Sequence, residues 1–182
     1  MNKKEQILYA AMALLVKNGV QATPMSAIAK EAQTGMGTIY NYFATKEDLI
    51  NALYIYAKQR QAAALTQTFT KDSIKKQFCT HYSAMINYLM ANPVEFSFLD
   101  QFTNSPLLTQ ATKDESITAI LPLSQLLLIG KKQKKVKPVA VNELLHFLEG
   151  ALMSYVRWAH TDKTNKHSLD NHIVMVWDAL KN

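Results

Sequence analysis

The 182-residue sequence has few of the features that interrupt helices, link distant segments or cross membranes. Glycine and proline number only five each, so we expect long helices with few breaks. A single cysteine, Cys79, excludes an internal disulfide and is typical of a reducing compartment such as the cytoplasm. No apolar run reaches the ~18 residues of a membrane-spanning helix, because the segment 121–129 is too short and contains Pro122. We therefore expect a cytoplasmic protein without a membrane partner.

The sequence also lacks the motifs of common catalytic and metal sites. It contains no HExxH, P-loop, GxSxG or CxxC pattern. The five histidines are scattered, and the spacing of His167 and His172 fits neither a helical pair nor a zinc signature. We therefore predict no catalytic residue, no metal site and no cofactor, which makes an enzyme the poorer interpretation.

The N-terminus has a superficial similarity to a secretion signal. A basic start is followed by an apolar run from Ile7 to Val16, but Glu5 and Gln6 interrupt the basic region. Gly19 then indicates the end of a helix. We therefore interpret this segment as the first helix of the folded protein.

The charge balance is basic, with a formal net charge of +6 and a pI near 9.3. Such a balance suits a polyanionic partner without identifying one. The segment from Lys131 to Lys137 alone contains five lysines, and we interpret it as a solvated loop between helices. A secondary contact to nucleic acid or to an acidic partner is the alternative.

The segment from Thr23 to Lys46 is the most informative part of the sequence. Thr23 is predicted to cap a short helix that begins at Pro24. The apolar face of that helix consists of Met25, Ile28, Ala29 and Ala32. Residues 33–37 form a turn, with two glycines available for unusual backbone angles. A second helix of barely two turns, residues 38–43, surrounds an apolar anchor of Ile39 and Phe43 with polar and phenolic groups. A helix of this kind can lie in the major groove of DNA.

This segment resembles the DNA-binding domain of the TetR family of bacterial transcriptional regulators. The residues that carry the resemblance are Gly19, Thr23, Ile28, Ala29, Ala32, Gly37, Thr38, Ile39, Tyr40, Tyr42, Phe43, Lys46 and Glu47. The sequence departs from the family pattern at Gln33, where a turn glycine is usual, at Gly35, where serine is common, and at Met36, where many members carry a polar residue. The turn glycine is thus expected two positions later.

The resemblance implies an all-α fold, and helical patterns indicate about nine helices. It implies a three-helix helix-turn-helix DNA-binding domain at residues 1–46 and a helical ligand-binding and dimerisation domain at residues 47–182. Beyond the motif, spacing and capping signals predict a helix at 45–69 that Thr45 caps, one at 73–91 that Asp72 or Ser73 opens, and one at 93–102 that starts at Asn92-Pro93. They also predict an irregular helical stretch from 105 to 130, bent at Pro122, a helix at 139–160, and one at 169–180 that Ser168 opens.

The helices at 139–160 and 169–180 are apolar over so much of their surface that each needs two neighbours. In a protein resembling TetR, these helices would pair with their copies in a second subunit. We therefore expect a homodimer through residues 139–160 and 168–181.

The resemblance also implies roles in DNA binding. Tyr40, Tyr42 and Lys46 would contact phosphates, Thr38 and Asn41 would reach base edges, and Met36 could contact a thymine methyl group. The complete predicted set is Thr23, Ser26, Met36, Gly37, Thr38, Tyr40, Asn41, Tyr42 and Lys46. The predicted partner is double-stranded operator DNA with a palindromic sequence, because a two-fold dimer presents two such helices.

In this family the larger domain usually encloses a small-molecule pocket. The candidate lining residues are Phe78, Tyr82, Met85, Phe98, Phe102, His146 and Glu149. Aromatic residues at helical spacing are also typical of a plain core, and His146 and Glu149 could instead bond across the dimer. The composition indicates a small, largely apolar effector.

Together these observations predict a ligand-responsive transcriptional regulator, a repressor that binds a palindromic operator as a dimer and is released by a small molecule. The alternative is a dimeric ligand-binding or interaction protein of the same fold with weakened DNA specificity. Activation instead of repression fits the same sequence, because the sign depends on where the operator lies.

Overall fold

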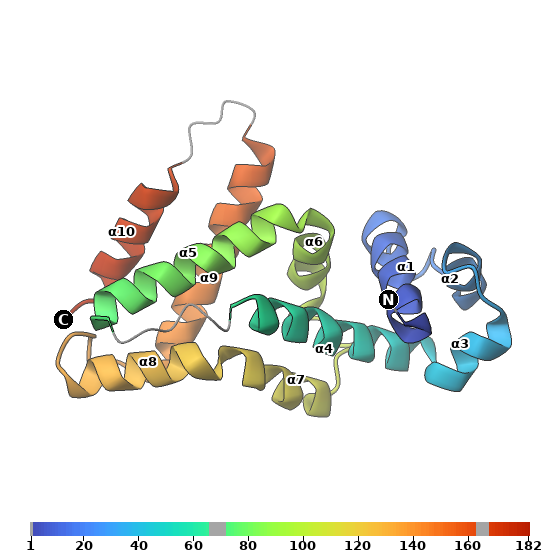
Figure 1. The fold of residues 1–182 in the computed structure, drawn as a ribbon, viewed down its shortest axis with the longest axis horizontal. Coiled ribbons are helices and arrows are strands. Elements are labelled where there is room, and N and C mark those ends of the chain that lie inside the picture. Colours follow the sequence, from blue (N-terminus) through green and yellow to red (C-terminus); the bar gives the residue numbers. More distant parts are fainter. Residues whose placement is uncertain (1, 66–71, 163–167) are drawn as a thin grey trace. The chain divides into compact units, whose positions relative to one another are not determined.

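The computed structural model describes residues 2–65, 72–162 and 168–182. Within these residues the fold is all-α, with ten α-helices and one 3₁₀ helix (Figure 1). The helices are α1 (Lys3–Asn18), α2 (Met25–Glu31), α3 (Met36–Tyr42), α4 (Lys46–Ala64), α5 (Ile74–Ala91), α6 (Pro93–Phe102), α7 (Gln110–Ser116), η1 (Ile117–Ile120), α8 (Leu121–Lys132), α9 (Val141–Thr161) and α10 (Leu169–Leu180). The predicted all-α fold is confirmed. None of the helices in the described ranges is long and apolar enough to cross a membrane.

The chain forms two compact units, each assembled from two stretches of sequence. The first contains residues 1–60 and 92–117, and the second contains residues 61–91 and 118–182. Helix α4 therefore begins in the first unit and ends in the second. These units are defined by packing alone, so the functional boundary predicted between residues 46 and 47 stays a prediction.

Helix α1 has a reciprocal side-chain cap at its start and a glycine at its end. The Asn2 side chain accepts from the Glu5 backbone N–H at 2.9 Å, and the Glu5 carboxylate accepts from the Asn2 N–H at 2.9 Å. Gly19 ends the helix at φ 77°, a left-handed conformation that glycine adopts without strain, and its N–H donates to the Leu15 carbonyl. The predicted helix end at Gly19 is confirmed.

The turn between α2 and α3 differs from the prediction. Gln33 itself adopts the left-handed conformation, with φ 47°, so the unusual backbone angle is not transferred to a glycine. Gly35 is extended, with φ −79° and ψ 154°, and is the N-cap of α3. Helix α3 consequently starts at Met36, two positions earlier than expected, and includes Gly37.

Helix α4 is capped as predicted by Thr45. The Thr45 hydroxyl accepts from the Asp48 N–H at 3.0 Å, and the Asp48 carboxylate accepts from the Thr45 N–H at 3.0 Å. Among the described residues α4 ends at Ala64. The predicted continuation to Phe69 falls on residues 66–71, which lie outside the described residues, as does His167.

Helix α5 is the centre of the second unit, where it contacts α8, α9 and α10 (Figure 1). On its apolar face the Phe78 ring stacks on the Tyr82 ring at 5.3 Å and meets the Trp177 ring of α10 at 5.5 Å. The Tyr82 hydroxyl lies 3.3 Å from both the Leu148 carbonyl and the His172 Nε2. This aromatic cluster fastens α5 to α9 and α10.

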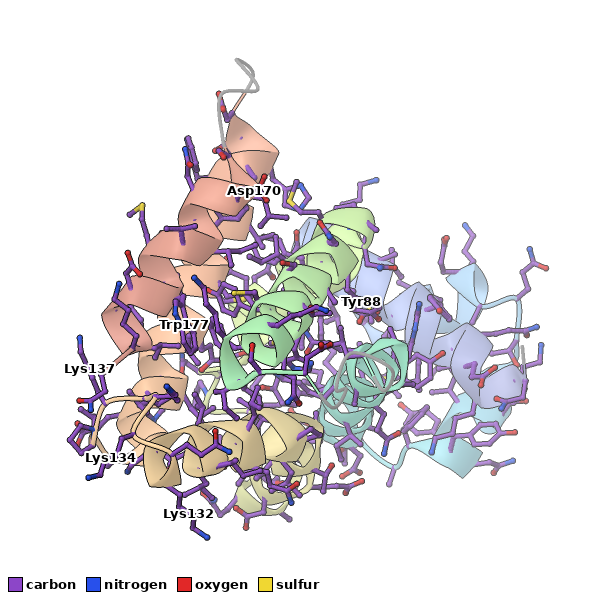
Figure 2. The ribbon with its side chains drawn as sticks, turned by 60° about the vertical axis from the view of Figure 1, so that its left-hand side comes forward. Tyr88, Lys132, Lys134, Lys137, Asp170 and Trp177 are labelled. Carbon is purple, nitrogen blue, oxygen red and sulfur yellow. The ribbon has the colours of Figure 1, made fainter. Side chains whose placement is uncertain are left out.

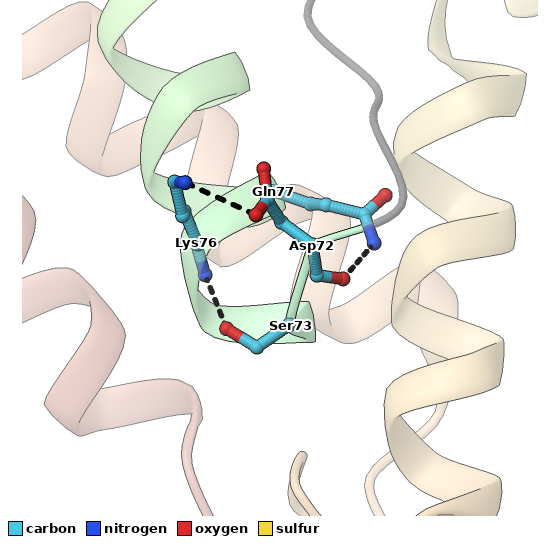
Figure 3. A network of polar contacts seen from close by, with 4 residues as sticks. All are labelled: Asp72, Ser73, Lys76 and Gln77. Carbon is cyan, nitrogen blue, oxygen red and sulfur yellow. Dashed lines mark hydrogen bonds and ion pairs between the residues drawn. The ribbon is translucent and has the colours of Figure 1, made fainter.

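The start of α5 is held by a small polar network (Figure 3). Ser73 accepts from the Lys76 N–H at 3.3 Å, and the Lys76 ammonium pairs with the Asp72 carboxylate at 3.0 Å. The Gln77 side-chain amide donates to the Asp72 carbonyl at 2.6 Å. The helix start predicted at Asp72 or Ser73 is confirmed to within a residue.

The irregular helical stretch predicted from 105 to 130 is divided in the structure. Thr109 caps α7, whose end runs through η1 into α8. Pro122 lies in the first turn of α8, where its missing N–H costs no intrahelical hydrogen bond. The proline therefore lies at the start of a helix, and the bend predicted there stays a prediction.

The lysine-rich segment is fastened to the end of α10. Val136 is buried and forms an isolated bridge with Lys181, and the Lys137 N–H donates to the Leu180 carbonyl at 2.9 Å. The Lys137 ammonium also donates to the Ala179 carbonyl at 2.7 Å, which places a cation at the negative end of the α10 dipole. The labelled Lys132 and Lys134 point away from the helices (Figure 2).

Candidate nucleic-acid interface

Helix α3 separates an apolar anchor from an exposed polar face. Ile39 is fully buried and Phe43, which caps the helix, is almost so. The exposed residues of α3 are Met36, Gly37, Tyr40, Asn41 and Tyr42, while Thr38 is half-buried. Tyr40 is 51% exposed and Tyr42 is 46% exposed, so both phenol groups are accessible to a partner. The exposed face of this seven-residue helix therefore presents hydroxyl, amide and thioether groups.

The Lys46 ammonium both makes a hydrogen bond within the first unit and keeps N–H donors for a partner. Its ammonium donates to the Val20 carbonyl at 2.7 Å and fastens the start of α4 to the turn that follows α1. A lysine ammonium has three protons, so two remain for a phosphate. Ser26 of α2 is exposed, as is Lys30 at the end of that helix.

Thr23 has a structural role in place of the predicted cap. Its side chain is fully buried, and its hydroxyl lies 2.8 Å from the Gly19 carbonyl and 3.2 Å from the Leu14 carbonyl. Pro24 is the N-cap of α2 and makes no side-chain cap. Thr23 therefore fastens the segment before α2 to the end of α1. Because a fully buried hydroxyl with carbonyl partners cannot face DNA, this structural role replaces its predicted DNA contact.

A cluster of aromatic rings and one carboxylate around Arg60 joins helices α1, α4 and α6 of the first unit, and it was not predicted from the sequence. The Arg60 guanidinium lies 5.0 Å from the Tyr9 ring centre and 5.9 Å from that of Tyr56, and it hydrogen-bonds the Tyr9 hydroxyl. It also pairs at 3.6 Å with Glu95, a carboxylate that is only 3% exposed. Burial, and then the nearby carboxylates of Glu5 and Glu95, raise the pKa of the Tyr56 hydroxyl. The cluster ties α1 to α4 and α6.

The second unit contains an open pocket of about 570 Å³. Its described lining residues are Ala62, Ala63, Leu65, Gln77, His81, Thr118, Ala119, Pro122, Gln125, Leu126 and Ile129. None of these described residues is charged at neutral pH, because burial lowers the pKa of the His81 imidazole to about 4. The polar groups of the lining are thus an imidazole, a hydroxyl and two amides, and one amide, that of Gln77, is held by Asp72.

The seven effector-contacting residues predicted from sequence are not among the described lining of this pocket. Phe78 and Tyr82 belong to the aromatic core of the second unit, and Phe98 stacks on Phe102 at 4.6 Å in the core of the first. Met85 is half-buried on α5, His146 is exposed on α9, and Glu149 is half-buried there. Aromatic residues at helical spacing here serve packing, which is the plainer interpretation that the sequence had left open.

Helices α9 and α10 contact each other and leave large apolar side chains uncovered. The exposed apolar residues on these helices are Phe147, Trp158, Val174 and Met175. Met175, the most exposed of them, is 69% accessible. Monomeric proteins rarely expose several large apolar groups on adjoining elements, so this face is a candidate for association.

Comparison with known proteins agrees with this arrangement. Residues 7–53 match the family model for bacterial regulatory proteins of the tetR family. A relative from Haemophilus influenzae, named as an uncharacterized HTH-type transcriptional regulator, is 31% identical over 106 residues, which make up 56% of this chain and 55% of that protein. The match thus spans about half the length of that curated relative.

Solved structures match over the whole chain. A protein from Shewanella sp. PV-4 assigned to the tetR family covers 100% of both chains with a TM-score of 0.91 and 24% identity. A TetR family transcription regulator from Marinobacter aquaeolei VT8 covers 99% of this chain and 96% of its own, with a TM-score of 0.88 and 21% identity. At these identities the superpositions establish the fold. Together with the match of residues 7–53 to the tetR family model, they show that this chain has the fold of the TetR family transcription regulators on which it superposes.

Proposed function

We propose that this protein is a DNA-binding transcriptional regulator of the TetR family, a repressor that binds a palindromic operator as a homodimer and is released by a small, largely apolar molecule. The observation that carries the proposal is the exposed face of α3, which a buried Ile39 holds in place. Because Ile39 anchors the helix, the two tyrosines and the asparagine on its exposed face are available to a polar partner.

In the proposed complex, α3 lies in the major groove. Tyr40, Tyr42 and Lys46 contact phosphates, and these contacts set the register and make binding dependent on salt. Thr38 and Asn41 reach base edges, Met36 lies beside them, and Gly37 lets the backbone approach the groove. Ser26 adds a contact from α2, the helix that crosses the DNA backbone.

The proposed dimer forms through residues 139–160 and 168–181. The uncovered side chains of α9 and α10 support it, because burying them against a second copy would remove a large apolar area from water. A two-fold dimer carries two α3 helices and therefore matches two half-sites in inverted orientation.

The proposed effector site is the 570 Å³ pocket of the second unit. Its volume is within the range of small-molecule sites, and its uncharged described lining supports a largely apolar effector with a few hydrogen-bonding groups. Ala62 and Ala63 line it near the end of α4, the helix that begins at Lys46. Release follows if the effector binds the operator-bound and free arrangements unequally.

The proposal keeps the functional division at residues 46 and 47, with DNA binding before it and effector binding and dimerisation after it. A regulator of this kind acts on the chromosome, so we place it in the bacterial cytoplasm.

The first experiment is selection from a randomised duplex library at near-physiological salt. We expect an enriched palindrome, and we expect Asn41→Ala and Tyr42→Ala to weaken binding to it by at least about tenfold. Asn104→Ala, an exposed asparagine of the first unit outside α3, is the matched control and should bind normally. Normal binding by both α3 variants would refute the assignment of α3. Weak binding that is equal across sequences would favour the alternative of a dimeric ligand-binding protein.

A further inference from the structure

The face that α3 presents to a partner has an uneven chemistry. Its sequence, MGTIYNY, contains neither a basic nor an acidic residue. The exposed groups are the Met36 thioether, the Asn41 amide and two phenols, with the hydroxyl of Thr38 half-buried beside them. The Gln33 side chain, in the turn that precedes α3, is also exposed and adds a second amide.

These groups do not read all bases equally. In the major groove, guanine is recognised mainly by arginine or lysine and cytosine by a carboxylate, both of which α3 lacks. Adenine is recognised by asparagine or glutamine through two hydrogen bonds, and thymine by apolar contact with its methyl group. Every base-specific pairing available to Asn41, Gln33 and Met36 is therefore with an A·T pair.

The neighbouring charged residues do not supply the missing readers. Lys30 and Glu31 lie at the end of α2, the element that crosses the DNA backbone in this type of domain. Lys46 lies beyond the other end of α3, with its ammonium bonded to the Val20 carbonyl. Lys4 of α1 lies 5.9 Å over the Phe43 ring, on the buried end of α3. These cations can neutralise phosphates but do not belong to the reading face.

We propose that the base pairs read by Asn41 and Met36 in each half-site are A·T pairs, with Asn41 on an adenine and Met36 against a thymine methyl group. The inference rests on the proposed function, in which α3 lies in the major groove. It goes beyond that function by naming the class of DNA sequence that the protein selects.

The test compares libraries selected by the unmodified protein, Asn41→Ala and Asn41→Arg. The positions read by α3 are those whose base preference changes between proteins. At the Asn41 position we expect the unmodified protein to prefer adenine over guanine by roughly 10- to 100-fold and Asn41→Ala to lose the preference. Asn41→Arg should select guanine there, since arginine donates two hydrogen bonds to its O6 and N7. Circular dichroism verifies that both variants are folded.

A second measurement isolates the methyl contact. Replacing thymine by uracil in the selected operator removes only the C5-methyl group, and we expect affinity to fall about fourfold at the position that Met36 covers. The Met36→Ala protein should be insensitive to this replacement. Uracil at positions unaffected by α3 substitutions is the matched control.

The outcomes separate the inference from the function on which it rests. A palindrome whose α3-dependent positions are G·C would overturn the inference and leave the regulator intact. A palindrome with no position that responds to α3 substitutions would also overturn it. A library without any enriched sequence would contradict both the inference and the proposed operator binding.

Discussion

The two compact units use polar groups in opposite ways. The first buries Thr23, Asn51, Glu95 and Thr112 inside its core and exposes the hydroxyl and amide groups of α3. The second is held by stacked aromatic rings and buries only two of the described polar side chains, Gln61 and His81. On its surface it exposes hydrocarbon along α9 and α10.

This difference follows from what the core of each unit has to hold in position. Hydrogen bonds are directional, so buried polar contacts such as that of Thr23 determine how one short helix lies against another. A helix of seven residues, such as α3, buries too little to be oriented by apolar packing alone. Apolar packing is non-directional and scales with area, which suits the proposed role of the second unit, in which its uncovered side chains meet another copy and its pocket binds a small molecule. The predictions below test this contrast.

The largest effect is expected from a charge on the apolar face of α9. Phe147→Glu should dissociate the proposed dimer, because burial of an unpaired carboxylate in an apolar interface is strongly unfavourable. Loss of the second α3 helix should then weaken operator binding by about 100-fold or more. Sedimentation and operator titration measure the two effects. Val94→Glu, which charges an equally exposed apolar residue on α6, is the control. A dimer that survives Phe147→Glu would remove this face from the proposed interface.

The second prediction concerns His81, which is 4% exposed in the second unit. Burial lowers the pKa of its imidazole from 6.5 to about 4, so between these values the unfolded chain binds a proton that the folded chain does not. Stability is therefore full above pH 6.5 and declines as the pH falls towards 4, by up to about 3 kcal/mol. Denaturant titrations across this range should show the loss. In His81→Gln the slope should shrink but persist in part, because burial also lowers the pKa of His172. An unchanged slope would contradict the assignment to His81.

The third prediction tests the polar core of the first unit. The Asn51 amide donates to the Glu47 carbonyl at 2.8 Å and the Leu107 carbonyl at 2.9 Å, and its oxygen accepts from the Thr109 N–H at 2.9 Å. Asn51→Ala leaves these groups without their partner and should lower the free energy of unfolding by about 2 kcal/mol. Asn51→Asp keeps only the acceptor and should recover a minor part. Asn104→Ala should change stability little, and an equal loss there would refute a special role for Asn51.

Local signals explain most of what the sequence predicted correctly. The caps at Thr45 and Ser168, and the start of α6 at Asn92-Pro93, depend on side chains within three residues of the backbone groups that they satisfy. Ile39 and Phe43 were predicted as the anchor of α3 because helical spacing identifies one buried face. Family resemblance supplied the arrangement of these helices.

Features that depend on distant pairing were not predictable. Arg60 meets Tyr9 and Glu95, which lie far from it on either side in the sequence, and no periodicity marks such a contact. Asn51 pairs with Leu107 in the same way. The left-handed Gln33 was missed because propensity favours glycine there, whereas the packing of α2 against α3 imposes the turn on the residue present. Phe78 and Tyr82 show that composition alone does not distinguish a core from a pocket.

The smallest effects should come from two helical glycines of the second unit that have opposite surroundings. A Cβ on Gly130 of α8 would lie 2.6 Å from a methyl group of Val136, which the lysine-rich segment holds in place, whereas a Cβ on Gly150 of α9 would meet no atom within 4 Å. Gly130→Ala should therefore destabilise by about 1 kcal/mol, because the contact outweighs the gain in helix propensity. Gly150→Ala should stabilise the subunit by up to about 1 kcal/mol.

Thermal unfolding, combined with sedimentation, distinguishes the two sites. If Gly150→Ala weakens the dimer while leaving the subunit more stable, the partner helix must approach α9 within van der Waals contact at this residue. If it changes only stability, the second copy meets α9 elsewhere, along the Phe147 and Trp158 side chains. A stabilising Gly130→Ala would show that Val136 can move aside at little cost in free energy. The lysine-rich segment would then not belong to the rigid core of the second unit, despite its hydrogen bonds to the end of α10.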